Sequence, residues 1–102
     1  MSKNSKLPGQ CQSIDEIREE IDHLDEEIIA LLGKRFLYVK EIVRFKSTRE
    51  EIVATDRYNA VISNRRELAL RNNLSPDIIE KMYRLLIAHF IEEENKILES
   101  KI

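Results

Sequence analysis

Residues 13–46 read SIDEIREEIDHLDEEIIALLGKRFLYVKEIVRFK, and this stretch decides the fold. Its apolar side chains recur at intervals of three and four, the spacing that predicts one long amphipathic helix. These positions are Ile14, Ile17, Ile21, Leu24, Ile28, Leu31, Tyr38, Ile42 and Phe45. Ser13 and Glu16 form the S-x-x-E pattern of a capping box, which predicts that the helix begins here.

Two shorter helices are expected after this long one. The first starts at Thr55 or Asp56 and runs to Asn72, because asparagine suits a helix C-terminus. Residues 75–77, Ser-Pro-Asp, then supply an N-cap, a proline at the first helical position and an acidic first turn. They predict a third helix that continues to about Leu98.

The apolar sides of these two helices are expected to face inward. On the second helix they comprise Tyr58, Val61, Ile62, Leu68 and Ala69. On the third they comprise Ile79, Met82, Tyr83, Leu86, Phe90, Ile91 and Ile97. Residues 46–53, KSTREEIV, have no clear period and are expected to form a loop.

Composition favours an all-α protein. The 102 residues are 42% hydrophobic and 35% charged, with two glycines and two prolines. We expect a polar N-terminal tail over residues 1–12 and a single helical domain over residues 13–102. The net charge of −2 does not favour nucleic acid as a partner. No apolar run approaches the roughly 20 residues that span a membrane.

The single cysteine and the two histidines suggest no cofactor. Cys11 is the single cysteine, which fits a reducing compartment, and the tail lacks the apolar core of a secretory signal. We therefore expect a cytoplasmic protein. His23 and His89 have no partner at ligand spacing, so no metal site is expected.

The length of the first helix predicts a dimer. A helix over residues 14–45 would be about 48 Å long at about 1.5 Å per residue. A compact domain of this size has a radius of gyration near 13 Å. Two short helices cannot cover the whole apolar stripe, so we expect a second copy of the chain to cover it in an intertwined homodimer.

Arg35 stands where the apolar stripe would place an aliphatic residue. Lys46 follows eleven residues later, so a continuous helix would point both side chains to the same side, with Val39 and Ile42 between them. Arg18 lies seventeen residues before Arg35, roughly 25 Å along the helix. An antiparallel partner helix would bring its own Arg18 to the Arg35 region.

Two interpretations of Arg35 remain open at this point. The guanidinium could extend to solvent along its stem, or pair with an acid such as Asp25. Alternatively, Arg35, Lys46, Arg18 and Arg57 form a cluster of cations. Such a cluster would bind a small dicarboxylate through bidentate guanidinium–carboxylate bonds.

An acid on the third helix is a further candidate. Glu94 falls on the stripe that contains Ile91, whereas Glu93 falls on the stripe that contains Phe90. Periodicity alone does not choose between these two acids.

The quoted residues resemble a known family. DEIREEIDHLDEEIIALLGKRFLYVKEIVRFK, residues 15–46, is similar to the all-helical chorismate mutases and most resembles their relatives, the isochorismate pyruvate lyases. The resemblance runs without a gap from about residue 13 to residue 98. The I-D-x-x-D element at residues 21–25 and the R-F-K that ends at Lys46 are fairly specific when both lie on one long helix.

The resemblance implies the fold and the site. The family fold is an intertwined dimer of three-helix chains in which Arg18 of one protomer and Arg35 of the other hold substrate carboxylates. Lys46 would reach a carboxylate and the ether oxygen whose bond breaks. Arg57 matches a further carboxylate-binding arginine, and Glu94 matches a position, commonly glutamine, that is hydrogen-bonded to the same ether oxygen. Three apolar residues would line the substrate: Val39, Ile42 and Ile91.

Ala54 and Tyr58 depart from the pattern, since many chorismate mutases carry acids there, and this departure resembles the lyase branch. The resemblance thus implies an isochorismate pyruvate lyase with secondary chorismate mutase activity and no cofactor, in which residues 46–53 close as a lid. A dedicated chorismate mutase is the first alternative. A non-catalytic helical dimer that binds partner helices is the second.

Overall fold

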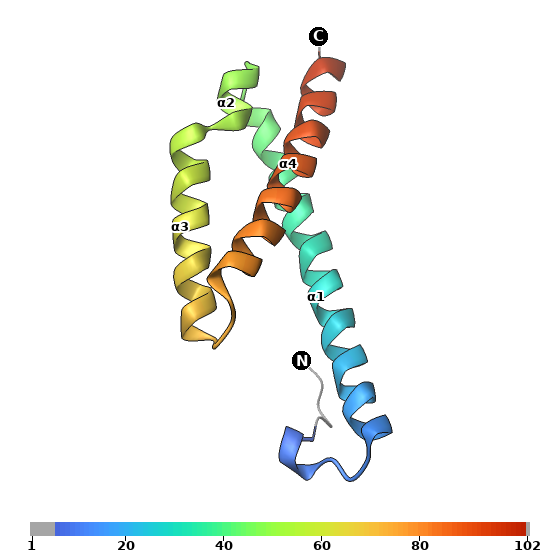
Figure 1. The fold of residues 1–102 in the computed structure, drawn as a ribbon. Coiled ribbons are helices and arrows are strands. Elements are labelled where there is room, and N and C mark those ends of the chain that lie inside the picture. The colour runs from blue at the N-terminus through green and yellow to red at the C-terminus, as the bar shows by residue number, and fades with distance from the viewer. Residues whose placement is uncertain (1–5, 102) are drawn as a thin grey trace. The chain divides into compact units, whose positions relative to one another are not determined.

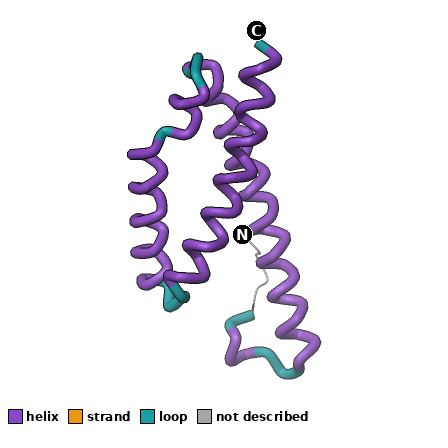
Figure 2. Tube along the Cα trace, turned by 45° about the horizontal axis from the view of Figure 1, so that its top comes forward, coloured by secondary structure: helices purple, strands orange, loops and turns teal. Residues whose placement is uncertain are grey.

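The structure is a computed structural model that describes residues 6–101. Its elements in chain order are η1 (Pro8–Gln10), α1 (Ile14–Ile42), η2 (Val43–Phe45), α2 (Arg49–Val53), α3 (Thr55–Arg71) and α4 (Pro76–Ser100). Within the described residues every regular element is a helix (Figure 1), and the same holds when the trace is coloured by secondary structure (Figure 2). The predicted all-α class, with a long first helix, is confirmed.

Local hydrogen bonds set the start of α1, which has 29 residues. The Ser13 hydroxyl accepts from the Glu16 amide at 3.1 Å, as the S-x-x-E pattern predicts. The Glu16 carboxylate, however, accepts from the Gln12 amide at 2.6 Å and pairs with Lys6 at 3.0 Å. Both bonds lower the pKa of Glu16 from its ordinary value, and the hydrogen bond from Gln12 has the larger effect.

The chain divides into two compact units, residues 1–37 and residues 38–102. The first unit holds η1 and most of α1. The second holds the last residues of α1 followed by η2, α2, α3 and α4.

The apolar stripe of α1 is exposed within the chain. In the first unit each of the following side chains is between 44% and 65% exposed: Ile14, Ile17, Ile21, Leu24, Ile28 and Leu31. The single chain thus leaves one apolar face of α1 open to solvent.

In the second unit α3 and α4 form a helical hairpin (Figure 1). The turn between them is a Schellman motif: Asn73 takes a left-handed φ of 59°, and the Leu74 amide donates to the Ala69 carbonyl at 2.9 Å. The Ser75 hydroxyl then accepts from the Ile78 amide at 3.2 Å and caps α4. The predicted helix end and N-cap are therefore confirmed.

The core of the second unit is small. Its buried apolar side chains are Val43, Ile52, Val61, Ile62, Ala69, Phe90 and Leu98. Most of the residues expected to face inward on α3 and α4 are buried or half-buried. Two are not: Met82 is 58% exposed and Leu68 is 40% exposed.

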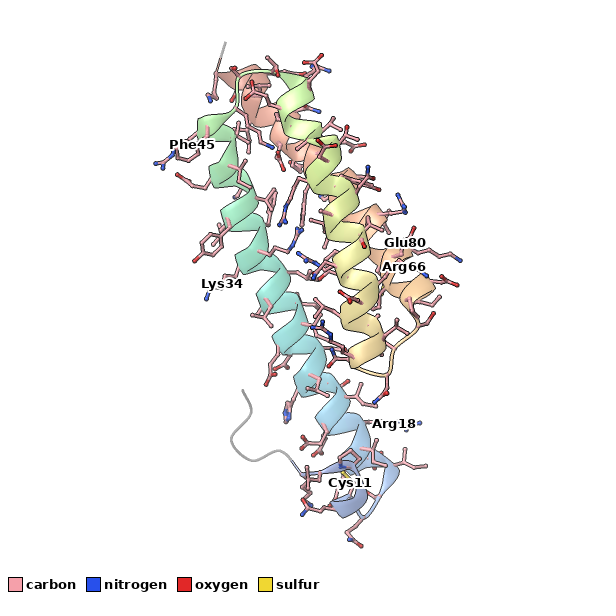
Figure 3. All side chains as sticks on the ribbon, turned by 90° about the vertical axis from the view of Figure 1, so that its left-hand side faces the viewer. Cys11, Arg18, Lys34, Phe45, Arg66 and Glu80 are labelled. Atoms are coloured by element: carbon pink, nitrogen blue, oxygen red, sulfur yellow. The ribbon has the colours of Figure 1, made fainter. Side chains whose placement is uncertain are left out.

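A chain of polar contacts joins α3 to α4. Arg66 pairs with Asp77 at 2.9 Å and with Glu80 at 2.8 Å, and Glu80 also binds Arg84 at 2.7 Å (Figure 3). Arg84 in turn donates to the Tyr58 hydroxyl at 2.9 Å. The hydrogen bonds from Arg84 and Arg66 hold the pKa of Glu80 below its ordinary value. Arg66 of α3 therefore links the two helices through its ion pairs with Asp77 and Glu80 of α4.

Candidate active site

Lys46 lies outside the long helix. α1 ends at Ile42, the 3₁₀ turn η2 follows, and Lys46 has an extended backbone with φ −120° and ψ 142°. The expected helix over residues 14–45 is therefore present, with its last turn 3₁₀, but the eleven-residue helical spacing from Arg35 does not apply to the extended Lys46. The Lys46 side chain is half-buried, and its ammonium donates a long hydrogen bond of 3.5 Å to the Ile52 carbonyl.

The segment expected to be a loop contains a helix. Thr48 caps α2 by accepting from the Glu51 amide at 3.1 Å. The Glu51 carboxylate accepts from the Ser47 hydroxyl at 2.9 Å and the Ser47 amide at 3.3 Å, which lowers its pKa. Thr48 and Glu51 thus form the T-x-x-E pattern of a capping box. That pattern was the sequence signal for α2, but a helix of five residues is too short to show a period.

An apolar cluster holds α2 in place. Val43, Ile52 and Leu98 are 1%, 3% and 7% exposed and form this cluster, with Ile91 and Ile97 packed against it. The cluster joins η2, α2 and the end of α4. Because Lys46 lies between Val43 and Ile52 in the chain, the segment that carries this lysine is anchored in the apolar cluster at both ends.

Glu94 is the buried acid of the two candidates. Its residue exposure is 7%, and on α4 it lies three residues after Ile91 and four before Leu98. Side chains at these spacings share one face of a helix. Glu94 therefore faces the side of α4 that carries the apolar cluster, whereas Glu93 forms a surface ion pair with Lys96 at 3.3 Å.

Arg57 lies in the first turn of α3, where its side chain is exposed. The residue before this helix, Ala54, has a left-handed φ of 45°, a conformation that costs roughly 1–2 kcal/mol for a residue other than glycine. Tyr58, at the other position that departs from the mutase pattern, accepts a hydrogen bond from Arg84. The hydroxyl of Tyr58 therefore ties the first turn of α3 to α4.

The other predicted site residues lie on α1. Arg18 and Arg35 belong to the first unit, where Arg18 is exposed near the start of α1 (Figure 3) and Arg35 is half-buried. Val39 and Ile42 belong to the second unit, the former half-buried and the latter 43% exposed. In the second unit, Ile91 packs against the apolar cluster, the Lys46 ammonium binds the carbonyl of Ile52 of that cluster, and Glu94 is buried on α4.

Two shallow cavities of the second unit lie elsewhere. One of about 250 Å³ lies between α3 and α4, and it is lined by Arg65, Leu68, Ala69, Asn72, Leu74, Ile79 and Tyr83. The other, of about 270 Å³, is lined by Arg49, Glu50, Val53 and Thr55. None of the predicted site residues lines either cavity.

Residues 6–101 contain no group of three histidine, cysteine, aspartate or glutamate side chains that could hold a metal ion. Over the same residues, each helix is too short or too polar to cross a bilayer.

Comparison with known proteins assigns the family. The family described as chorismate mutase type II matches residues 17–95, which is most of the chain. The chain therefore belongs to the chorismate mutase type II family of enzymes.

Two relatives are similar over most of this chain. An isochorismate pyruvate lyase from Pseudomonas aeruginosa is 35% identical over 91 residues, which cover 89% of this chain and 90% of the relative. A T-protein from Haemophilus influenzae is 31% identical over 86 residues, or 83% of this chain but 23% of that protein. These similarities support an enzyme, and they do not favour the expected alternative of a non-catalytic helix-binding dimer.

Proposed function

We propose that this protein is an isochorismate pyruvate lyase, which converts isochorismate to salicylate and pyruvate, with secondary chorismate mutase activity. The similarity to the Pseudomonas lyase along nearly the whole length of both chains carries the proposal. Such an enzyme would act in a cytoplasmic compartment, as the single cysteine suggests.

The proposed reaction takes place within one substrate molecule. The ether C–O bond breaks while a ring hydrogen moves to the enolpyruvyl methylene carbon, which leaves aromatic salicylate and pyruvate. Atoms and electrons balance without a nucleophile or a redox partner. The protein then has two tasks, to hold the enolpyruvyl arm over the ring and to stabilise the charge that develops on the ether oxygen.

Lys46 and Glu94 are the catalytic residues of this proposal. The Lys46 ammonium would stabilise negative charge on the ether oxygen, and its half-buried position makes the interaction stronger than in bulk water. The Glu94 carboxyl would donate a hydrogen bond to the same oxygen when protonated, since an ionised carboxylate only accepts. Burial of Glu94 on the same side of α4 as the apolar cluster supports this pairing.

Cations and apolar side chains would bind the rest of the substrate. Arg35 and Arg57 would hold its carboxylates, together with Arg18 of a second copy of the chain. The apolar ring would lie against Val39, Ile42 and Ile91. Because guanidinium groups bind carboxylates in a bidentate manner, this arrangement suits a dicarboxylate such as isochorismate.

The second copy is part of the proposal. The exposed stripe of α1 supports an intertwined homodimer, because six aliphatic side chains of the first unit are left at least 44% exposed by the single chain. An antiparallel pairing of two α1 helices would cover both stripes and supply Arg18 to the partner's site. Residues 46–53 would act as the lid over that site.

A dedicated chorismate mutase that makes prephenate is the second candidate. The similarity to part of the T-protein and the family assignment favour it. Ala54 and Tyr58 favour the lyase, because many mutases of the resembling family carry acids at these two positions. Tyr58 uses its hydroxyl for Arg84 instead.

Product analysis separates the two candidates. The purified protein is incubated with isochorismate and, separately, with chorismate, and products are identified by mass spectrometry. We expect salicylate and pyruvate from isochorismate at a kcat/KM higher than that for prephenate formation. Prephenate from chorismate with no salicylate from isochorismate would establish the mutase instead.

Lys46→Met tests the catalytic role. Loss of the ammonium should lower kcat for the lyase reaction by about 10²- to 10³-fold, the cost of removing one charge-stabilising donor. Lys34→Met, which removes an exposed lysine of α1, is the matched control and should retain full activity. Equal activity in the two variants would exclude Lys46 as the catalyst.

A further inference from the structure

The last turn of α4 contacts the segment that carries Lys46 through polar groups as well as apolar ones. The Lys101 ammonium donates to the Val43 carbonyl at 2.9 Å in a partly buried contact. The Glu99 carboxylate forms an ion pair with the guanidinium of Arg49, the first residue of α2. Leu98, in the same turn, belongs to the apolar cluster.

These contacts involve residues that precede and residues that follow Lys46 in the sequence. The Val43 carbonyl accepts from the Lys46 amide at 3.2 Å as well as from Lys101, so one oxygen joins the backbone of Lys46 to the end of α4. On the other side, the Lys46 ammonium donates to the carbonyl of Ile52, which is buried against Leu98. The position of the ammonium therefore depends on contacts made by α4.

We propose that Glu99 and Lys101 are positioning residues that, with Leu98, form a C-terminal clasp. The clasp holds α2 and η2 together and thereby orients the Lys46 ammonium. The catalytic consequence rests on the proposed role of Lys46, whereas the structural consequence, an ordered α2, does not.

The length of α2 explains why a clasp is needed. A helix of five residues is far below the roughly 12–15 residues at which an isolated helix becomes even marginally stable. Its capping box and the buried Ile52 stabilise it, but Ile52 is its one buried residue. Tertiary contacts at Arg49 and near Val43 therefore decide whether the segment keeps one conformation.

The exposed ion pair between Arg49 and Glu99 is expected to affect catalysis by fixing the position of α2, and not by adding to global stability. The Arg49 and Glu99 side chains are 67% and 56% exposed, and pairs this exposed add little to global stability. Catalysis is more sensitive, because a displacement of about 1 Å can cost about 10²-fold in rate. Loss of the clasp should consequently lower kcat strongly and should change the melting temperature only slightly.

Charge exchange tests the ion pair. Glu99→Arg places two guanidinium groups together, and Arg49→Glu places two carboxylates together. The double variant Arg49→Glu/Glu99→Arg restores opposite charges. It also puts an acid at the start of α2 and a base near the end of α4, where both suit the helix dipoles. Each single variant should lower kcat about tenfold, and the double variant should recover most of the loss.

Lys101→Met tests the second contact, because it keeps the aliphatic stem and removes the donor. The readout besides activity is hydrogen exchange of the Ile52 and Ala54 amides, which donate within α2 to the carbonyls of Thr48 and Glu50. Their exchange should accelerate about tenfold, while that of buried Ile62 in α3 stays unchanged. Lys96→Met, which breaks an exposed ion pair with Glu93 on the same helix, is the matched control and should leave both readouts unchanged.

The outcomes distinguish this proposal from the proposed function. Unchanged exchange of α2 in both Glu99→Arg and Lys101→Met would overturn the clasp, whatever the activity. Faster exchange with unchanged kcat would overturn the positioning role and leave the lyase assignment intact. If the parent protein turns over neither substrate, the proposed function fails, and the exchange measurement still decides whether the clasp orders α2.

Discussion

Glu94 is an ionisable residue in a buried position. A carboxyl group is usually exposed, yet Glu94 is 7% exposed on a helix face that otherwise carries Ile91 and Leu98. Burial of this kind is common where a side chain serves a reaction and not only the packing. The proposed hydrogen bond to the ether oxygen gives Glu94 such a role, provided that the carboxyl carries its proton.

Glu94→Gln tests the need for a proton. A glutamine amide donates a hydrogen bond at every pH, whereas a carboxyl donates only when protonated. We therefore expect Glu94→Gln to keep the hydrogen bond to the ether oxygen and to retain lyase activity. Glu94→Ala, which removes the donor altogether, should lose about 10²-fold in kcat. Equal kcat values for Glu94→Gln and Glu94→Ala would contradict the assigned role.

The elements of the second unit show two ways to join helices. α3 and α4 are long enough to bury apolar side chains along their contact, and the ion pairs of Arg66, Glu80 and Arg84 add to that contact. α2 is short, so its position depends on Ile52 and on groups at the end of α4. The α3–α4 contact should unfold together with the whole unit, whereas α2 should unfold locally while α3 and α4 stay folded.

Glu80 makes the α3–α4 contact sensitive to acid. Its pKa is lower in the folded protein than in the unfolded chain, because the folded carboxylate is bound by Arg84 and Arg66. The stability that Glu80 contributes is therefore present above its unfolded-state pKa and is lost as the pH falls through its folded-state pKa. Glu80→Gln should lower the free energy of unfolding at pH 7 and have little effect at pH 3.

Urea denaturation of the parent protein and Glu80→Gln at both pH values measures the difference. Glu93→Gln, which removes a carboxylate from a single exposed ion pair on the same helix, is the control and should change less at pH 7. A Glu80→Gln effect of equal size at pH 3 and pH 7 would show that the ion pairs are not its cause.

At the scale of the whole molecule the main feature is the stripe of α1. Apolar residues are placed along a helix of 29 residues, about 44 Å at about 1.5 Å per residue. The chain leaves six residues of the stripe at least 44% exposed in the first unit alone. The proposed homodimer would cover this surface and complete each active site with Arg18 of the partner copy.

Ile28→Asp tests the dimer. A carboxylate at the centre of the stripe would be buried once in each copy at a cost of several kcal/mol per ion, so the variant should be monomeric. Sedimentation equilibrium measures the mass, and lyase activity should fall with it. Glu26→Gln is the control: it changes the charge by one unit about 160° around the same helix and should leave the mass unchanged. A dimeric Ile28→Asp variant would show that this stripe is not the interface.

The features that depend on residues close together in the chain were predictable from the sequence. Periodicity predicted the three long helices, and local caps predicted their ends, as Ser75 at the start of α4 and the asparagines after α3 confirm. Helix formation and capping act within a few residues along the chain, so a local pattern is sufficient to predict them. The chain's similarity to chorismate mutases was likewise visible in the order of residues along the chain, and the family match covers residues 17–95.

The features that depend on residues far apart in the chain became visible in the folded structure and not before. Lys46 falls outside α1, α2 exists as a helix, and Glu94 is buried while Glu93 is not. The contacts that hold α2 join residues 50 and 58 positions apart, namely Arg49 with Glu99 and Val43 with Lys101. No periodic pattern relates residues at such separations, because they become neighbours only when α4 packs against η2 and α2.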